Sequence, residues 1–169
     1  MKLNERHHAF ISATFFRELR DEGFENYQEA FLHATRKYAE QRGSRMAQRA
    51  IRDGRKLDFA AYRWYGEWQH TPEYLATVEG PKDEKVEDGK NSTRKIFHCP
   101  WSSQYLDMNL LDGANDYCSV LDISIARGFN PELTFLVKQT MHNNRDFCIQ
   151  SQVDADMGKE RGWGPRNPE

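Results

Sequence analysis

The spacing of apolar residues changes along the chain, and this change restricts the fold more than any other feature. Up to about residue 70, apolar residues recur every three or four positions, which is the spacing of one helix face. From about residue 72 to residue 153, short runs rich in β-branched and aromatic residues are separated by Gly, Pro and Asn. This order predicts an α+β domain: N-terminal helices followed by an antiparallel sheet with an inserted helix.

The first part of the chain contains three predicted helices. Gly23 can end the first helix, whose apolar stripe should be buried. Gly43 either breaks the second helix or lets another element approach closely, and Ser44 could cap a continuation that ends at Gly54. Asp58 can cap the third helix. The stripe of the first helix consists of Phe10, Ile11, Phe15, Phe16 and Leu19.

The second part contains four predicted strands and one helix between them. Residues 73–80 and 92–99 are typical of strands, and residues 132–141 and 145–153 are typical of a hairpin. Residues 116–127 form the inserted helix. We therefore expect a single domain over residues 1–169, with a helical part at about 5–70, a sheet-containing part at about 72–153 and a polar tail at 154–169.

Composition limits the partners of this domain. With 169 residues and a net charge of −2, the chain can bury a core and has no basic excess for nucleic acid. It has no apolar run long enough for a membrane span, and "MKLNERHHAF" lacks a signal-peptide core, so we expect a cytoplasmic protein. Residues 59–68 are rich in aromatics, which favours core packing over a pocket wall or a homodimer interface.

The inserted helix carries the most unusual pair of side chains in the sequence. Asn115 or Asp116 can cap its start, and Gly128 lies just past its expected end. Cys118 and Asp122 are four residues apart, so their side chains lie on one helix face. Because a carboxylate disfavours a thiolate, Asp122 suits proton transfer or the binding of a cationic group better than simple activation of the thiol.

The other cysteines lie on strands. The sequence has three cysteines without a CxxC pair, which does not indicate a disulfide framework. Cys99 follows His98 at a strand end. Cys148 alternates with Phe147 and Ile149, so it points away from their apolar face, which favours a place in a pocket wall.

Zinc is an alternative use of the same side chains. The candidate ligands come from three separate elements and lack the close spacing that is typical of zinc sites. We therefore expect no cofactor, while a divalent metal such as zinc stays an open alternative. The candidate ligands are Cys99, Cys118, Cys148, His98 and His142.

The order of three short motifs, "HCPW", "YCSVLDISIARGFNP" and "RDFCIQ", resembles the L-2-amino-thiazoline-4-carboxylate hydrolase family. More distantly, the chain is similar to 4-vinyl reductase-type domains that bind small molecules. Where the family commonly has Gly before the last aspartate of its pattern, this chain has Arg145. The family's motif positions correspond to Cys99, Cys118, Asp122, Asp146 and Cys148.

The resemblance implies a hydrolase that opens a small cyclic amidine or amide ring, such as a thiazoline carboxylate. It implies that Cys118 is the nucleophile and that Asp122 is the acid and base or the amidinium anchor. Asp146 or His142 would then orient water. Substrate-binding candidates are Cys99, Cys148, His98 and Arg145. The alternative is a non-catalytic small-molecule-binding or sensor domain on the vinyl reductase-type fold.

Overall fold

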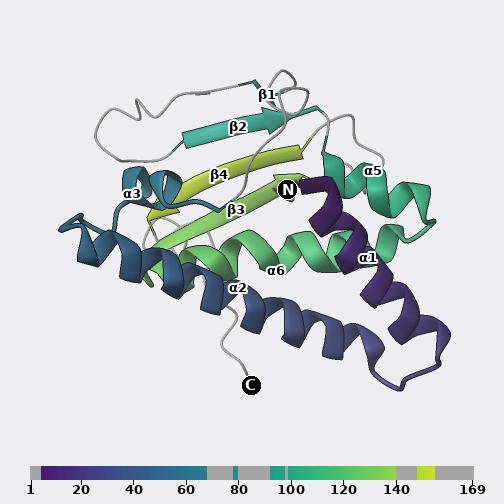
Figure 1. Cartoon of the computed structure of the whole chain (residues 1–169). Helices are drawn as coiled ribbons and strands as arrows, with labels where there is room; N and C mark the ends of the chain where they lie inside the picture. Colours follow the sequence, from purple (N-terminus) through teal and green to yellow (C-terminus); the bar gives the residue numbers. More distant parts are fainter. Residues whose placement is uncertain (1–4, 68–77, 80–91, 98, 140–147, 155–169) are drawn as a thin grey trace.

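The computed structural model describes residues 5–67, 78–79, 92–97, 99–139 and 148–154. The described chain forms helices that pack on one another, with short strands along one side (Figure 1). The helices are α1 (Glu5–Asp21), α2 (Tyr27–Arg52), α3 (Phe59–Trp64), α5 (Pro100–Asp107) and α6 (Leu111–Phe129). The strands are β1 (Val78–Glu79), β2 (Ser92–Ile96), β3 (Leu133–Gln139) and β4 (Cys148–Asp154).

Helices α2 and α6 lie side by side through the middle of the molecule, and two glycines let their backbones touch (Figure 1). A Cβ added to Gly43 would lie 2.0 Å from the carbonyl oxygen of Ile125, and one added to Gly128 would lie 2.1 Å from that of Glu40. The close approach predicted at Gly43 is therefore confirmed. The alternative, a helix break at this glycine, is wrong because α2 continues through it.

The buried face of α1 differs from the predicted stripe. Phe16 is fully buried as expected, but the rest of the buried face is formed by small residues such as Ala9 and Ala13. Phe10 and Phe15 are 51% and 63% exposed. Alanines on the inner face let α1 lie close to the neighbouring helices. Close packing therefore decides which face of α1 is buried, and the size of its apolar side chains does not.

Most of the predicted stops and caps in the helical part are confirmed. Gly23 and Gly54 have φ angles of +70° and +68°, a conformation that favours glycine after a helix end. The Asp58 carboxylate accepts a hydrogen bond of 2.9 Å from the backbone N–H of Ala61 and so caps α3. The predicted cap at Ser44 is wrong, because this residue lies inside α2.

Helix α6 extends beyond both of its predicted ends. It begins at Leu111, so the cap predicted at Asn115 or Asp116 is wrong. In its first turn, Gly113 lets the ring of Phe16 approach closely, since an added Cβ would lie 2.5 Å from that ring. Gly128 lies within the helix and contacts α2 instead of ending α6.

The backbones of the strands pair antiparallel in the order β1-β2-β4-β3. The pairing of β3 with β4 agrees with the predicted hairpin, whose turn lies outside the described residues. In the register of β2 and β4, Cys148 lies opposite Ile96. This register brings the last strand to the end of β2 from which the chain continues to Cys99 and α5.

The predicted fold class, α+β with N-terminal helices followed by an antiparallel sheet with an inserted helix, is wrong, because helices and not a sheet build the core. The part of the chain whose side chains are described is 76% helical and contains no complete strand. Its buried apolar side chains come almost entirely from helices, and two helices, α5 and α6, lie where one was expected. The physical reason is that the longest helices, α2 and α6, come from opposite halves of the chain and bury each other. None of the described helices has the length and apolar character needed to cross a membrane.

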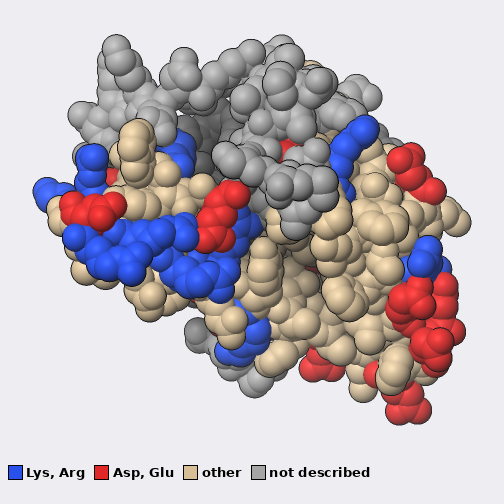
Figure 2. Space-filling model, viewed as in Figure 1, with Lys and Arg blue, Asp and Glu red and all other residues tan. Residues whose placement is uncertain are grey.

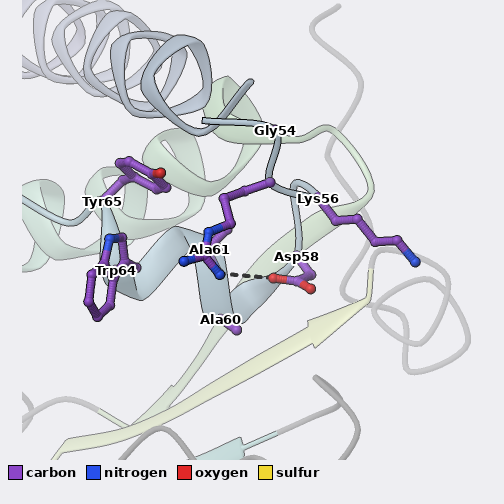
Figure 3. Close-up of a pocket in the computed structure, with 8 residues that line it drawn as sticks. Gly54, Lys56, Asp58, Ala60, Ala61, Trp64 and Tyr65 are labelled. Carbon is purple, nitrogen blue, oxygen red and sulfur yellow. Dashed lines mark hydrogen bonds between the residues drawn. The ribbon is translucent and has the colours of Figure 1, made fainter. Parts of the chain in front are cut away.

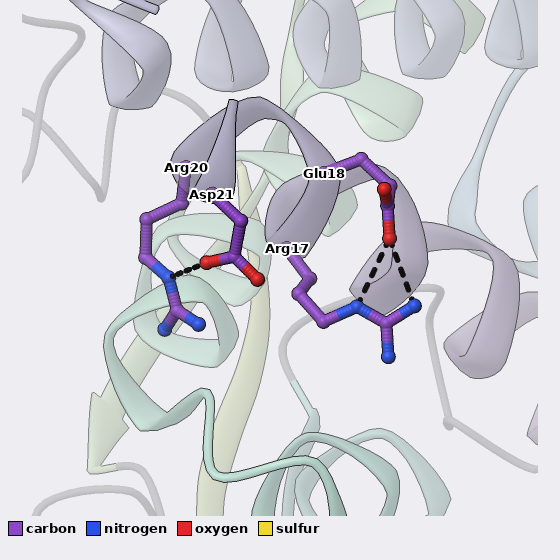
Figure 4. Close-up of polar contacts among 4 residues, drawn as sticks. All are labelled: Arg17, Glu18, Arg20 and Asp21. Carbon is purple, nitrogen blue, oxygen red and sulfur yellow. Dashed lines mark hydrogen bonds and ion pairs between the residues drawn. The ribbon is translucent and has the colours of Figure 1, made fainter. Parts of the chain in front are cut away.

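The last turns of α1 carry exposed ion pairs between residues adjacent in sequence (Figure 4). The Arg17 guanidinium donates to the Glu18 carboxylate at 2.8 and 3.1 Å, and Arg20 donates to Asp21 at 2.9 Å. Because water screens such pairs, they contribute little to the stability of the fold.

A cluster of arginines on α2 holds the chain after α3 in place. The Glu67 carboxylate pairs with Arg42 at 3.2 Å and Arg49 at 2.8 Å, and a third arginine, Arg45, lies at 3.9 Å. Arg49 also donates to the backbone oxygen of Tyr65 at 2.8 Å. Arg42 is only 2% exposed, so its pairing with Glu67 is the one least screened by water.

Protonation of His8 on α1 should destabilise this region. Burial lowers the pKa of His8 below its usual 6.5, and the positive charges of Arg42 and His7 lower it further, while Glu67 partly opposes them. As the pH falls below about 6.5, the unfolded chain takes up a proton at this position before the folded chain does. The contribution of neutral His8 is therefore present above about pH 6.5 and is lost as the pH falls towards the pKa of the folded state.

We expect His8→Gln to reduce the loss of stability on acidification from about pH 7 to about pH 5. The measurement is the urea midpoint of unfolding across this range, followed by circular dichroism. His33→Gln is the matched control, because His33 is exposed on α2. Parallel pH profiles for wild type and His8→Gln would show that His8 does not contribute to the acid sensitivity.

Candidate functional site

Cys99 lies at the start of α5. It is the N-cap residue, with an extended backbone (φ −113°, ψ 117°), and Pro100 occupies the first helical position, where no N–H is needed. The side chain does not have the geometry of a capping hydrogen bond. The backbone N–H groups of Trp101 and Ser102, together with the Ser102 hydroxyl, nevertheless lie close enough to lower the thiol pKa. Cys99 is thus a partly buried thiol beside donors that favour its thiolate.

Burial outweighs these donors and raises the pKa of Cys99, and the negative charge of Asp122 raises it further. Asp122 belongs to α6, which contacts α5, the helix that Cys99 caps. Cys118 acts in the same direction, since its charge raises the pKa of Tyr105 on α5. Cys118 and Asp122 are both partly buried. Cys118 follows Tyr117, whose ring centroid lies 6.2 Å from that of Tyr105 on α5, so this part of α6 lies beside α5.

Two tyrosines form an aromatic wall beside the thiols. The ring centroids of Tyr105 and Tyr117 are 6.2 Å apart, and the Tyr105 hydroxyl donates to the Ser12 hydroxyl at 3.0 Å. Burial raises the pKa of both phenols, so they stay protonated at neutral pH. Sequence reasoning missed this wall: Tyr105 lies in a segment of ambiguous structure, and the only signal at Tyr117 is its position next to Cys118.

For the third cysteine, Cys148, only the backbone position is described. The β2–β4 register sets Cys148 opposite Ile96, three residues before Cys99. The chain segments that carry Cys99 and Cys148 thus approach the same end of β2. The other predicted site residues, His98, His142, Arg145 and Asp146, lie outside the described residues. Their predicted roles stay predictions.

The zinc alternative also stays a prediction. Within the described ranges, no three His, Cys, Asp or Glu side chains gather as metal ligands. Of the five candidate ligands, only Cys99 and Cys118 have described side chains. Two thiols do not define a structural zinc site, which normally has four ligands in a tetrahedron.

A pocket of about 340 Å³ opens elsewhere on the described part of the chain, between the end of α2 and α3 (Figure 3). It is lined by Gly54, Arg55, Lys56, Asp58, Ala60, Ala61, Trp64 and Tyr65. On its inner side, α3 packs on the end of α6 through Tyr62 and Phe129, whose ring centroids are 5.5 Å apart. Asp122 precedes Phe129 by seven residues, or about 10 Å of helix. The pocket and the thiols are therefore separate features.

The described residues thus define a largely helical protein that carries two partly buried thiols, Cys99 and Cys118, and a partly buried carboxylate, Asp122. The sequence profile of the L-2-amino-thiazoline-4-carboxylic acid hydrolases matches residues 4–149, and the chain belongs to this family. The match includes Cys99, Cys118, Asp122 and Cys148. No curated protein and no solved structure matches the chain significantly.

Proposed function

We propose that this protein is a hydrolase that opens a small cyclic amidine, such as a 2-amino-thiazoline carboxylate, at the site formed by Asp122, Cys99 and Cys118. Membership of a family named for this activity supports the reaction class. The observation that carries the proposal is the contact between α5, which Cys99 caps, and α6, which bears Cys118 and Asp122. A thiol and a carboxylate are the two groups that this chemistry needs.

Asp122 suits the binding of an amidinium. A protonated cyclic amidine carries its positive charge over two nitrogens, and a carboxylate can accept a hydrogen bond from each. Pairing keeps the ring in its cationic form, in which the carbon between the nitrogens is most electrophilic. A cation at Asp122 also offsets the negative charge that raises the pKa of Cys99, so substrate binding favours the thiolate.

The reaction then needs two steps that share one site. In the first, the sulfur–carbon bond forms while the ring carbon–nitrogen bond breaks, and the proton released by the thiol passes through Asp122 to the departing ring nitrogen. In the second, water adds to the same carbon and expels the thiolate, which regains a proton. The products are the ring-opened amine with a carbonyl group at the former amidine carbon and the free thiol of the protein.

Of the two described thiols, we assign the attack to Cys99. Burial raises the pKa of the Cys99 thiol overall, and the N–H groups of Trp101 and Ser102 and the Ser102 hydroxyl are donors that offset part of this rise. Cys118 lies beside the buried phenols of Tyr105 and Tyr117, and it would line the substrate space. This assignment differs from the one based on sequence, which favoured Cys118 as the nucleophile.

The function is tested with purified protein and 2-amino-thiazoline-4-carboxylate, by following the release of the ring-opened amine. The matched comparison is 2-oxo-thiazolidine-4-carboxylate, which has the same ring size and carboxylate but no amidinium. We expect turnover of the amidine with kcat/KM at least about tenfold higher than for the neutral ring, because only the amidine pairs with Asp122. Calorimetric binding without turnover would instead support the sensor-domain alternative, and neither binding nor turnover would exclude this substrate class.

A further inference from the structure

The pocket between α2 and α3 has the dimensions of a small-ligand site. Its volume of about 340 Å³ is at the lower end of the range of roughly 300–1,000 Å³ that is typical of such sites. Gly54, with its φ angle of +68°, reverses the chain after α2 and places Arg55 and Lys56 in the lining, with the long side chain of Lys56 extending away from Trp64 and Tyr65 (Figure 3). The opposite wall is formed by α3, with Trp64 and Tyr65 at its end (Figure 3).

Hydrogen bonds from two neighbouring helices fix the walls of this pocket. Arg49 of α2 donates to the backbone oxygen of Tyr65 at 2.8 Å, which ties the end of α3 to α2. Asn130, at the end of α6, donates to the backbone oxygen of Leu57 at 2.8 Å, which ties down the segment before α3. The pocket is therefore formed before any ligand arrives, and binding does not have to order its walls.

The charge at the pocket favours an anion. Lys and Arg gather over the C-terminal half of α2 and the segment that follows it (Figure 2). Two cations, Arg55 and Lys56, line the pocket against a single acidic residue, Asp58, whose carboxylate already caps α3. Nearby Asp53 accepts a hydrogen bond from the Tyr65 hydroxyl.

The rim of the pocket carries a tryptophan that packing does not require. Trp64 is 67% exposed, whereas Phe59 of the same helix is 1% exposed and Tyr62 packs on Phe129. The core contacts of α3 are thus made without the indole. An exposed indole on a pocket rim offers a flat apolar face on which a planar ring can stack.

We propose that this pocket is a second ligand site, separate from the thiols, and that it takes a small planar carboxylate. The ring stacks on Trp64, and the carboxylate pairs with Arg55 and Lys56. A guanidinium matches the two oxygens of a carboxylate, and the ammonium adds a second donor. This site goes beyond the proposed hydrolase function, since none of its residues belongs to the thiol–carboxylate site.

The first test uses benzoate as the probe and the full chain as the protein. Binding is followed by NMR of the indole N–H signals, with Trp64→Phe identifying the signal of Trp64. We expect benzoate to shift the Trp64 signal in a saturable manner. Benzamide, which is planar but neutral, and cyclohexanecarboxylate, which is anionic but not planar, should each bind at least about tenfold more weakly. Inorganic phosphate binding as tightly as benzoate would identify a general anion patch and overturn the proposal.

The second test changes the pocket residues themselves. The double variant Arg55→Gln, Lys56→Gln should weaken benzoate binding by about tenfold or more, because charge-assisted hydrogen bonds are lost. Arg52→Gln is the matched control, since Arg52 is an exposed arginine of α2 that does not line the pocket. It should change affinity by less than about twofold. Unchanged circular dichroism and urea midpoints establish that the variants fold. Equal affinity of the double variant and wild type would overturn the proposal.

Discussion

Gly43→Ala should lower the free energy of unfolding by about 3 kcal/mol, or prevent folding altogether. At an ordinary helix position, the same replacement stabilises a protein by about 0.5–1 kcal/mol, because alanine favours the helix. Here the added Cβ would lie 2.0 Å from the carbonyl oxygen of Ile125 and 2.6 Å from the backbone nitrogen of Phe129. Both atoms belong to the α6 backbone, so the strain cannot be relieved by a change of side-chain rotamer.

The direction of the change in unfolding free energy distinguishes close helix packing, which predicts a decrease, from helix preference alone, which predicts an increase. The measurement is urea unfolding followed by far-UV circular dichroism, with Ser44→Ala as the control. Ser44 is exposed at the next position of α2, so alanine there tests helix preference without adding bulk between α2 and α6. Gly128→Ala should behave like Gly43→Ala, since its Cβ would lie 2.1 Å from the Glu40 oxygen. A stabilised Gly43→Ala protein would contradict the close packing of the two helices.

Asp122→Asn should lower kcat/KM for the cyclic amidine by about 10²–10⁴, or about 3–5 kcal/mol of transition-state stabilisation. The amide cannot pair with the amidinium as a carboxylate does, and it cannot pass a proton to the ring nitrogen. The control is Asp107→Asn, because Asp107 is exposed at the end of α5. Full activity of Asp122→Asn would contradict the proposed site.

The cysteine variants decide which thiol attacks. If Cys99 is the nucleophile, Cys99→Ser should lose about as much activity as Asp122→Asn, because a hydroxyl is far less ionised than a thiol. Cys118→Ser should then keep most of its activity, with its main effect on KM. The reverse pattern would establish Cys118 as the nucleophile, as the sequence suggested. Similar urea midpoints for all the variants would show that the differences are chemical and not structural.

The sequence predicted local features of this fold well and the packing of its helices poorly. Gly54 and Asp58 could be recognised because their roles depend on neighbouring backbone atoms. The buried face of α1 could not be recognised, because Ala9 and Ala13 become the inner side only when α1 meets other helices. The contact of Gly113 with Phe16 was missed for the same reason, since Phe16 is distant in sequence.

The same difference applies to the candidate site. The four-residue spacing of Cys118 and Asp122 could be noticed in the sequence because it lies within one helix. Tyr105 could not, because it meets Tyr117 of α6 only through the contact between α5 and α6.

The contact of Gly43 with α6 has a consequence for how the site can move. Two helices that touch backbone to backbone cannot slide past each other, because a displacement of one turn, about 5.4 Å, would push larger side chains into the gap left for hydrogen atoms. Helix α6, which carries Asp122, can therefore pack against α2 in only one position along the helix axis. In the proposed site, the α2–α6 pair therefore holds Asp122 in a fixed position.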